Sequence, residues 1–162
     1  MLVALPIGMF VATTAVLLAY LGTADPFYYR AAMIANIAGV VTALLAAVPG
    51  AIDLFALTPA SRTRTTAIQH GSFALLAVGL FAVSAALLWR GWTAAARGGD
   101  GPVLDATIPL AFAVCGLLVV VIVGALGWSL VQTHHVGVRP SAGRSDDLDV
   151  MPPRTERPAY RH

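Results

Sequence analysis

Three histidines and one aspartate stand at the ends of apolar segments, and they are the side chains in this sequence best suited to chemistry. Asp53 ends one apolar run, His70 opens the next, and His134 and His135 follow the last. Imidazole is a ligand for haem iron and for transition metals. A carboxylate can orient a ligating imidazole through its second ring nitrogen. We therefore take His70 and His134 as candidate haem b or metal ligands, with Asp53 as the third residue of a cofactor site.

Each of these residues also has a structural interpretation. His70 can form a hydrogen bond at a helix start, and Asp53 can pair with an arginine of the following turn. His134 and His135 stand where a cation suits a helix C-terminus and lipid phosphates. Two interfacial histidines also suit a quinone head group or a proton relay. Ionisable residues near membrane depth are costly and often functional, so both interpretations stay open.

Four apolar segments must position these residues. About 20 apolar residues in a helix cross a hydrocarbon core of ~30 Å. Four segments qualify, at about 2–21, 31–55, 67–89 and 106–131. Lipid cannot form hydrogen bonds with the backbone, so the segments are expected to be helices. Short connections make neighbouring helices antiparallel. The predicted fold is all-α: residues 1–138 form an up-down-up-down transmembrane four-helix bundle of cytochrome-b-like architecture. That topology brings Asp53, His70 and His134 to one membrane face at similar depth.

The composition supports a lipid environment. The chain has 162 residues, of which 58% are apolar and 11% charged, with a mean hydropathy of +0.79. Soluble domains carry about 25% charged residues. A net charge of +2 is too small to suggest nucleic-acid binding. The sequence contains no nucleophile elbow, phosphate-binding loop or metalloprotease motif, so no catalytic set is predicted.

Polar and small residues inside the segments predict how the helices pack. Asn36 is expected to form a hydrogen bond between helices, and Ala35 with Gly39 to allow close helix packing. Asp25 and Asp105 precede apolar segments, where an aspartate suits the N-cap of a helix.

The charges outside the segments indicate an orientation. Four helices put both termini on one side, and the positive-inside rule favours the cytoplasm for that side. Trp89 and Trp92 fit an aromatic belt on the opposite side. Residues 139–162 are rich in proline and charge, which predicts a disordered cytoplasmic tail. The arginines compared are Arg62, Arg64, Arg139 and Arg144 on the side of the termini, and Arg30, Arg90 and Arg97 on the other side.

Several motifs, in order and spacing, resemble a known family. They are residues 5–8 (LPIG), residues 47–53 (AVPGAID), His70, and residues 130–138 (LVQTHHVGV). Over residues 2–138 the chain resembles the bacterial membrane-protein family called domain of unknown function 2231. In that family a His-Pro pair often precedes the first helix, and this chain has Ala4 where a second histidine often stands. A start codon further upstream would restore the His-Pro pair. Relatives fused to Rieske iron–sulfur domains imply electron transfer.

The last motif departs from the family pattern. Trp128 and Ser129 replace a glycine and a glutamate that are common there, and His135 replaces a glycine. The resemblance therefore implies a site built from only some of the family's polar positions.

Two functions follow as hypotheses. The first is a redox-associated accessory protein of a bacterial inner membrane, with a haem b or metal site at His70 and His134. The second is a cofactor-free structural subunit of a larger membrane complex. The expected partners are the lipid bilayer and other membrane or redox subunits. A transporter is disfavoured, because Asn36 is the only strongly polar residue near mid-membrane.

Overall fold

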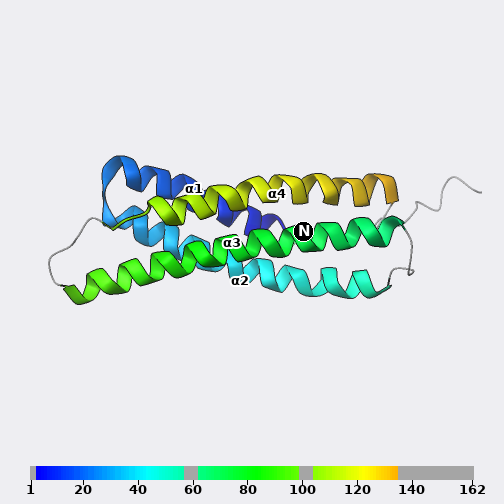
Figure 1. Ribbon diagram of the computed structural model, residues 1–162, viewed down its shortest axis with the longest axis horizontal. Helices are drawn as coiled ribbons and strands as arrows, with labels where there is room; N and C mark the ends of the chain where they lie inside the picture. The colour runs from blue at the N-terminus through cyan, green and yellow to red at the C-terminus, as the bar shows by residue number, and fades with distance from the viewer. Residues whose placement is uncertain (1–2, 57–61, 99–103, 135–162) are drawn as a thin grey trace, which may run out of the picture.

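The computed structural model describes residues 3–56, 62–98 and 104–134, and helix dominates each of these segments (Figure 1). Helix α1 spans Ala4–Thr23, α2 Pro26–Ala56, α3 Arg62–Gly98 and α4 Thr107–His134. All four are long and apolar enough to cross a membrane. The fold is the predicted all-α, antiparallel four-helix bundle. The predicted tail, residues 139–162, lies outside the described residues.

Helices α2 and α3 are longer than their apolar segments. Helix α2 begins at Pro26 because the Asp25 carboxylate accepts a hydrogen bond of 2.8 Å from the Phe27 N–H, which caps the helix as predicted. Helix α3 begins at Arg62 and ends at Gly98, whereas its apolar segment spans only residues 67–89. Hydropathy reports the part of a helix that suits lipid, and polar turns extend α3 beyond that part at both ends.

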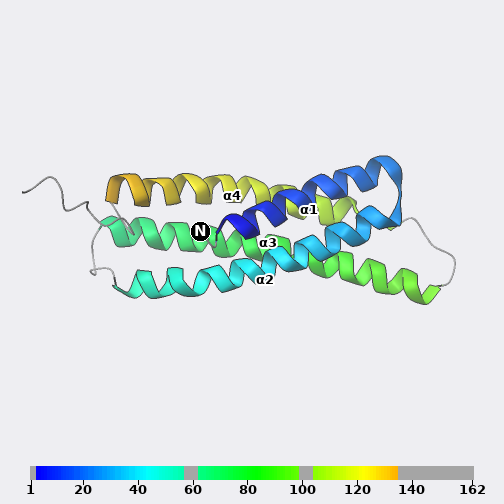
Figure 2. The same cartoon turned by 180° about the vertical axis from the view of Figure 1, so that it is seen from behind.

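The helices pack as two hairpins. Helix α1 packs mainly against α2, and α3 packs mainly against α4; α2 and α3 share a smaller interface, and α1 and α4 the smallest of the four. Figures 1 and 2 show that α1 begins near the middle of the long axis, while α2, α3 and α4 continue to the far end. We call the two parts the four-helix half and the three-helix half. The three-helix half includes the last turns of α2, which contain Asp53, and the first turns of α3, which contain His70.

A stack of two rings between two glycines fills the four-helix half. The rings of Phe10 and Phe81 are parallel within 7°, with centroids 3.9 Å apart. A Cβ atom at Gly39 would lie 2.8 Å from the ring of Phe10, and one at Gly116 would lie 2.6 Å from the ring of Phe81. Each helix therefore contributes one residue to this layer. We call Gly39, Phe10, Phe81 and Gly116 the ring layer.

A buried polar network joins three helices close to the ring layer. Asn36 and Ser84 are fully buried, and their side chains are 3.1 Å apart. The Ser84 hydroxyl donates to the Pro109 carbonyl at 2.9 Å. In the orientation that satisfies both ends of its amide, Asn36 donates to the Phe81 carbonyl and accepts from the Ala85 N–H, each at 3.2 Å. The predicted interhelical role of Asn36 is confirmed.

Replacing Asn36 with alanine should lower the free energy of unfolding by about 1–2 kcal/mol, because the bonds it makes to α3 are lost inside the bundle. Thr42→Val is the matched control, since among the described residues the Thr42 hydroxyl bonds to carbonyls of its own helix, at Ala38 and Gly39. Unfolding in mixed detergent micelles, followed by circular dichroism, measures both variants. Equal losses for the two would contradict an interhelical role for the amide.

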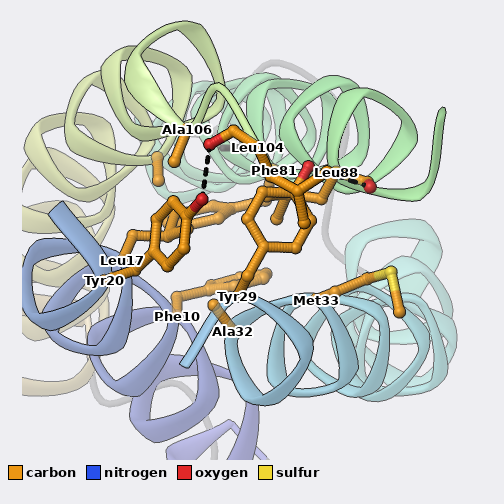
Figure 3. Close-up of a cluster of buried hydrophobic side chains, with 11 residues drawn as sticks. Phe10, Leu17, Tyr20, Tyr29, Ala32, Met33, Phe81, Leu88, Leu104 and Ala106 are labelled. Atoms are coloured by element: carbon orange, nitrogen blue, oxygen red, sulfur yellow. Dashed lines mark hydrogen bonds between the residues drawn. The ribbon is translucent and has the colours of Figure 1, made fainter. Parts of the chain in front are cut away.

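Two tyrosines secure the end of the four-helix half (Figure 3). The Tyr20 hydroxyl donates to the Leu104 carbonyl at 2.8 Å, and the Tyr29 hydroxyl donates to the Leu88 carbonyl at 3.1 Å. Their rings meet edge to face, with centroids 5.3 Å apart. Leu104 lies three residues before α4 begins, so the Tyr20 bond holds the segment leading into α4 against α1, and the Tyr29 bond joins α2 to α3.

Asp105 caps α4, as its position in the sequence predicts. Its carboxylate accepts a hydrogen bond of 2.8 Å from the Thr107 N–H. This backbone bond, together with a bond from the Thr107 side chain, lowers the pKa of Asp105 below its ordinary value. The carboxylate is therefore ionised at neutral pH, the form that serves best as a cap.

Candidate functional site

His70 lies in α3 with its ring directed at α4. The residue is half-buried, and its Nδ1 is 3.1 Å from the Val123 carbonyl oxygen of α4. A carbonyl oxygen can only accept, so Nδ1 carries the proton and donates. In the neutral ring, Nε2 then holds the free lone pair. A histidine fixed in this way by a backbone carbonyl presents Nε2 to a ligand, which is the usual arrangement of metal-bound histidines.

The absence of a side chain at Gly127 makes room for this ring. A Cβ atom at Gly127 would lie 3.2 Å from Cε1 of His70 and 3.5 Å from Nδ1. The imidazole therefore rests on the backbone of α4 between Val123 and Gly127. This contact fixes the ring from one side and leaves its orientation little freedom.

Asp53 stands in the last turn of α2, at the end of the bundle where α3 begins, but its side chain is exposed. Among the described residues no hydrogen bond joins it to His70, whose Nδ1 is bonded to Val123. The predicted orienting role of a carboxylate is thus filled by a backbone carbonyl. All residues from Ala47 to Asp53 are exposed, so this segment of α2 stands clear of its neighbours.

His134 ends α4, and its side chain lies outside the described part of the chain, as does His135 altogether. At the helical rise of 1.5 Å per residue, the backbone of His134 lies about 10 Å beyond Gly127 along α4. The ring of His70 is level with Gly127. The two histidines share one end of the bundle, and the packing of α3 on α4 sets the ring of His70 level with Gly127, short of the last turns of α4.

The described residues contain no group of three or more histidine, cysteine, aspartate or glutamate side chains that could hold a metal ion. At the opposite end, a pocket of about 250 Å³ opens between α1 and the start of α4, and Tyr20, Leu104 and Asp105 contribute to its wall. No histidine lines it. Among the described residues, the side chain with the clearest capacity for ligation is therefore His70.

Two partners of His70 carry little signal in the sequence. Val123 contributes only a backbone carbonyl, and Gly127 contributes only the space left by a missing side chain. A glycine two turns before the end of an apolar helix is common, so its pairing with His70 emerges only from the packing of α3 on α4.

Four apolar helices of membrane-spanning length, packed as an antiparallel bundle, define an integral membrane protein. The family model described as "Predicted membrane protein (DUF2231)" matches residues 1–140, and the chain belongs to this family. No curated protein and no solved structure matches the chain.

Proposed function

We propose that this protein is a redox-associated accessory protein of the bacterial inner membrane, and that His70 is the ligand of a metal or haem b at one membrane face. The bond from Nδ1 of His70 to the Val123 carbonyl carries this proposal, because it leaves Nε2 free to ligate. Lipid-buried spans rarely contain a titratable side chain without a function. When bound, haem b would supply one-electron transfer.

The packing limits how such a group could be held. The ring of His70 lies directly on the backbone of α4 at Gly127, so no porphyrin fits between α3 and α4 at that level. A haem b ligated by His70 would lie on the Nε2 side of the ring. A metal ion bound by Nε2 needs less room, and His134 and Asp53 are further ligand candidates at this end of the bundle. The position of His70 therefore suits a site with one fixed histidine ligand better than a haem held between His70 and His134.

An absorption spectrum and a metal analysis of the protein, purified in mild detergent after expression with ample haem and trace metals, test the proposal. The wild type should contain haem b or about one metal ion per chain. His70→Ala should lower the affinity for it by a factor of 10–100 or more, as the loss of a ligand or of its support does. His162→Ala removes an imidazole far from this site in the sequence and should leave the content unchanged. A wild type free of haem and metal would overturn the proposal.

The second candidate is a cofactor-free subunit of a larger membrane complex. The fully exposed segment from Ala47 to Asp53 favours it, because this surface of α2 has no covering helix in the chain and a partner helix would cover it. Crosslinking from a cysteine placed at Ala51, in native membranes, should then capture a defined partner. A cysteine at Ile34, in the opposite half of α2, is the control. The same products from both positions would remove the support for a partner at this segment.

The arginine distribution supports termini on the cytoplasmic side. Arg62 and Arg64 stand at the start of α3, at the end of the bundle where α4 ends, whereas Arg30, near the start of α2, and Arg90, in the last turns of α3, lie toward the other end. In this orientation the His70 end faces the cytoplasm. A reporter enzyme fused after residue 138, active only in one compartment, decides between the two orientations.

A further inference from the structure

A cation stacked on an aromatic ring lies at the end of the bundle opposite His70. The guanidinium carbon of Arg30, in α2, is 4.9 Å from the ring centroid of Trp92, in α3. Such a contact holds the flat guanidinium group over the ring face. A guanidinium that lies over a ring can still bond to an anion through the N–H groups on its outer edge.

No carboxylate neutralises Arg30 among the residues that the structure describes. The side chain is exposed, and the nearest acidic residue in the sequence, Asp25, uses its carboxylate to cap the Phe27 N–H at 2.8 Å. A positive charge fixed in place and lacking an internal partner creates a site for an external anion. The planar fork of a guanidinium suits the oxygens of a phosphate.

The depth of Arg30 places this charge at a membrane boundary. At 1.5 Å per residue, Arg30 and Asp53 lie about 35 Å apart along α2, slightly more than the ~30 Å hydrocarbon core. The large exposed side chains of Phe27 and Trp89 lie at the same end of the bundle. Aromatic side chains at this level mark the head-group region.

An apolar track leads from Arg30 toward the centre of the membrane. Ile34, Ile37 and Val41 are 61%, 39% and 50% exposed. They follow Arg30 at helical spacing and so share its face of α2. A ligand that binds Arg30 with a phosphate can therefore lay a hydrocarbon chain along this face.

We propose that Arg30 and Trp92 form a binding site for the head group of an anionic phospholipid such as phosphatidylglycerol. The phosphate accepts hydrogen bonds from the guanidinium, Trp92 holds the guanidinium in place, and one acyl chain lies along Ile34, Ile37 and Val41. A zwitterionic lipid binds less well, because its own ammonium group offsets the attraction to Arg30.

Quenching of Trp92 fluorescence by brominated lipids tests this site. The protein carries Trp89→Phe and Trp128→Phe so that Trp92 is the only tryptophan. It is reconstituted in phosphatidylcholine bilayers that contain increasing fractions of a lipid brominated near the head-group end of its chains. The quenching curves give the affinity of brominated phosphatidylglycerol relative to brominated phosphatidylcholine. The attraction of one arginine for an anionic lipid at the bilayer surface should make this affinity ratio about five.

Arg30→Gln should bring the ratio close to one, and Arg90→Gln, an exposed arginine of α3 at the same end, should leave it near the wild-type value. A ratio near one in the parent protein would overturn the proposal, as would a preference that survives Arg30→Gln or is lost equally in both variants. If a co-purified protein covers Trp92 and protects it from quenching by both brominated lipids, the site belongs to a protein partner and the lipid proposal fails. Circular dichroism of each variant confirms that the helices are intact.

Discussion

Replacing Phe81 with alanine should lower the free energy of unfolding by about 3–5 kcal/mol, the usual cost of removing a buried phenylalanine. Phe81 is fully buried, stacks on Phe10 at 3.9 Å, and contacts Gly116 on its other side. The substitution removes the ring that joins α1 to α4 across the bundle, and the rigid backbones at Gly39 and Gly116 cannot close the space.

Unfolding by a denaturing detergent in mixed micelles, followed by circular dichroism, measures this loss. Leu75→Ala is the matched control, because Leu75 lies on the same helix with 62% of its surface exposed. In lipid or detergent, its truncation leaves no cavity and should cost little. A Phe81→Ala protein as stable as Leu75→Ala would show that the ring layer does not hold the bundle together.

The second large effect is expected from filling the space at Gly116. Gly116→Val should destabilise the protein by about 1–3 kcal/mol, the range for overpacking a tight core. Its Cβ would lie 2.6 Å from the ring of Phe81, and that ring cannot withdraw, because Phe10 lies against its other face and is itself backed by Gly39.

Gly124→Val provides the comparison on the same helix. Gly124 is exposed, and a Cβ atom there would have nothing within 4 Å. That variant should be neutral or slightly stabilising, because valine restricts the unfolded backbone more than glycine does. If both valine variants have the same free energy of unfolding, the close approach of Phe81 to Gly116 does not limit the stability of the bundle.

The sequence predicts the bundle well because lipid leaves few alternatives. Four apolar segments of spanning length allow little other than four helices, and Asp25 and Asp105 are found as caps where their positions predict. The predicted pairing of Asn36 across helices is also found, since a mid-membrane amide must be satisfied by a neighbour. The helix ends were predicted less well, because the polar turns that lengthen α3 carry no hydropathy signal.

The candidate site is less predictable for a physical reason. Sequence spacing gives the order of His70, Asp53 and His134 along the chain, but their relative depth depends on how α3 slides against α4. The contacts of His70 with Val123 and Gly127 fix that register, and neither partner carries a distinctive side chain. The small-residue pair of Ala35 and Gly39 illustrates the same point: close packing was predicted there, but only the structure identifies Phe10 as the ring that Gly39 admits.

The division into hairpins has a consequence for biogenesis. Because α1 packs chiefly on α2, and α3 chiefly on α4, each pair can leave the translocon as a finished unit before the other has been synthesised. The stacked rings of Phe10 and Phe81 then come from different units, so they form only when the two units meet within the bilayer. Assembly of this protein would accordingly resemble the dimerisation of two half-molecules, with the stacked rings as the recognition element between them.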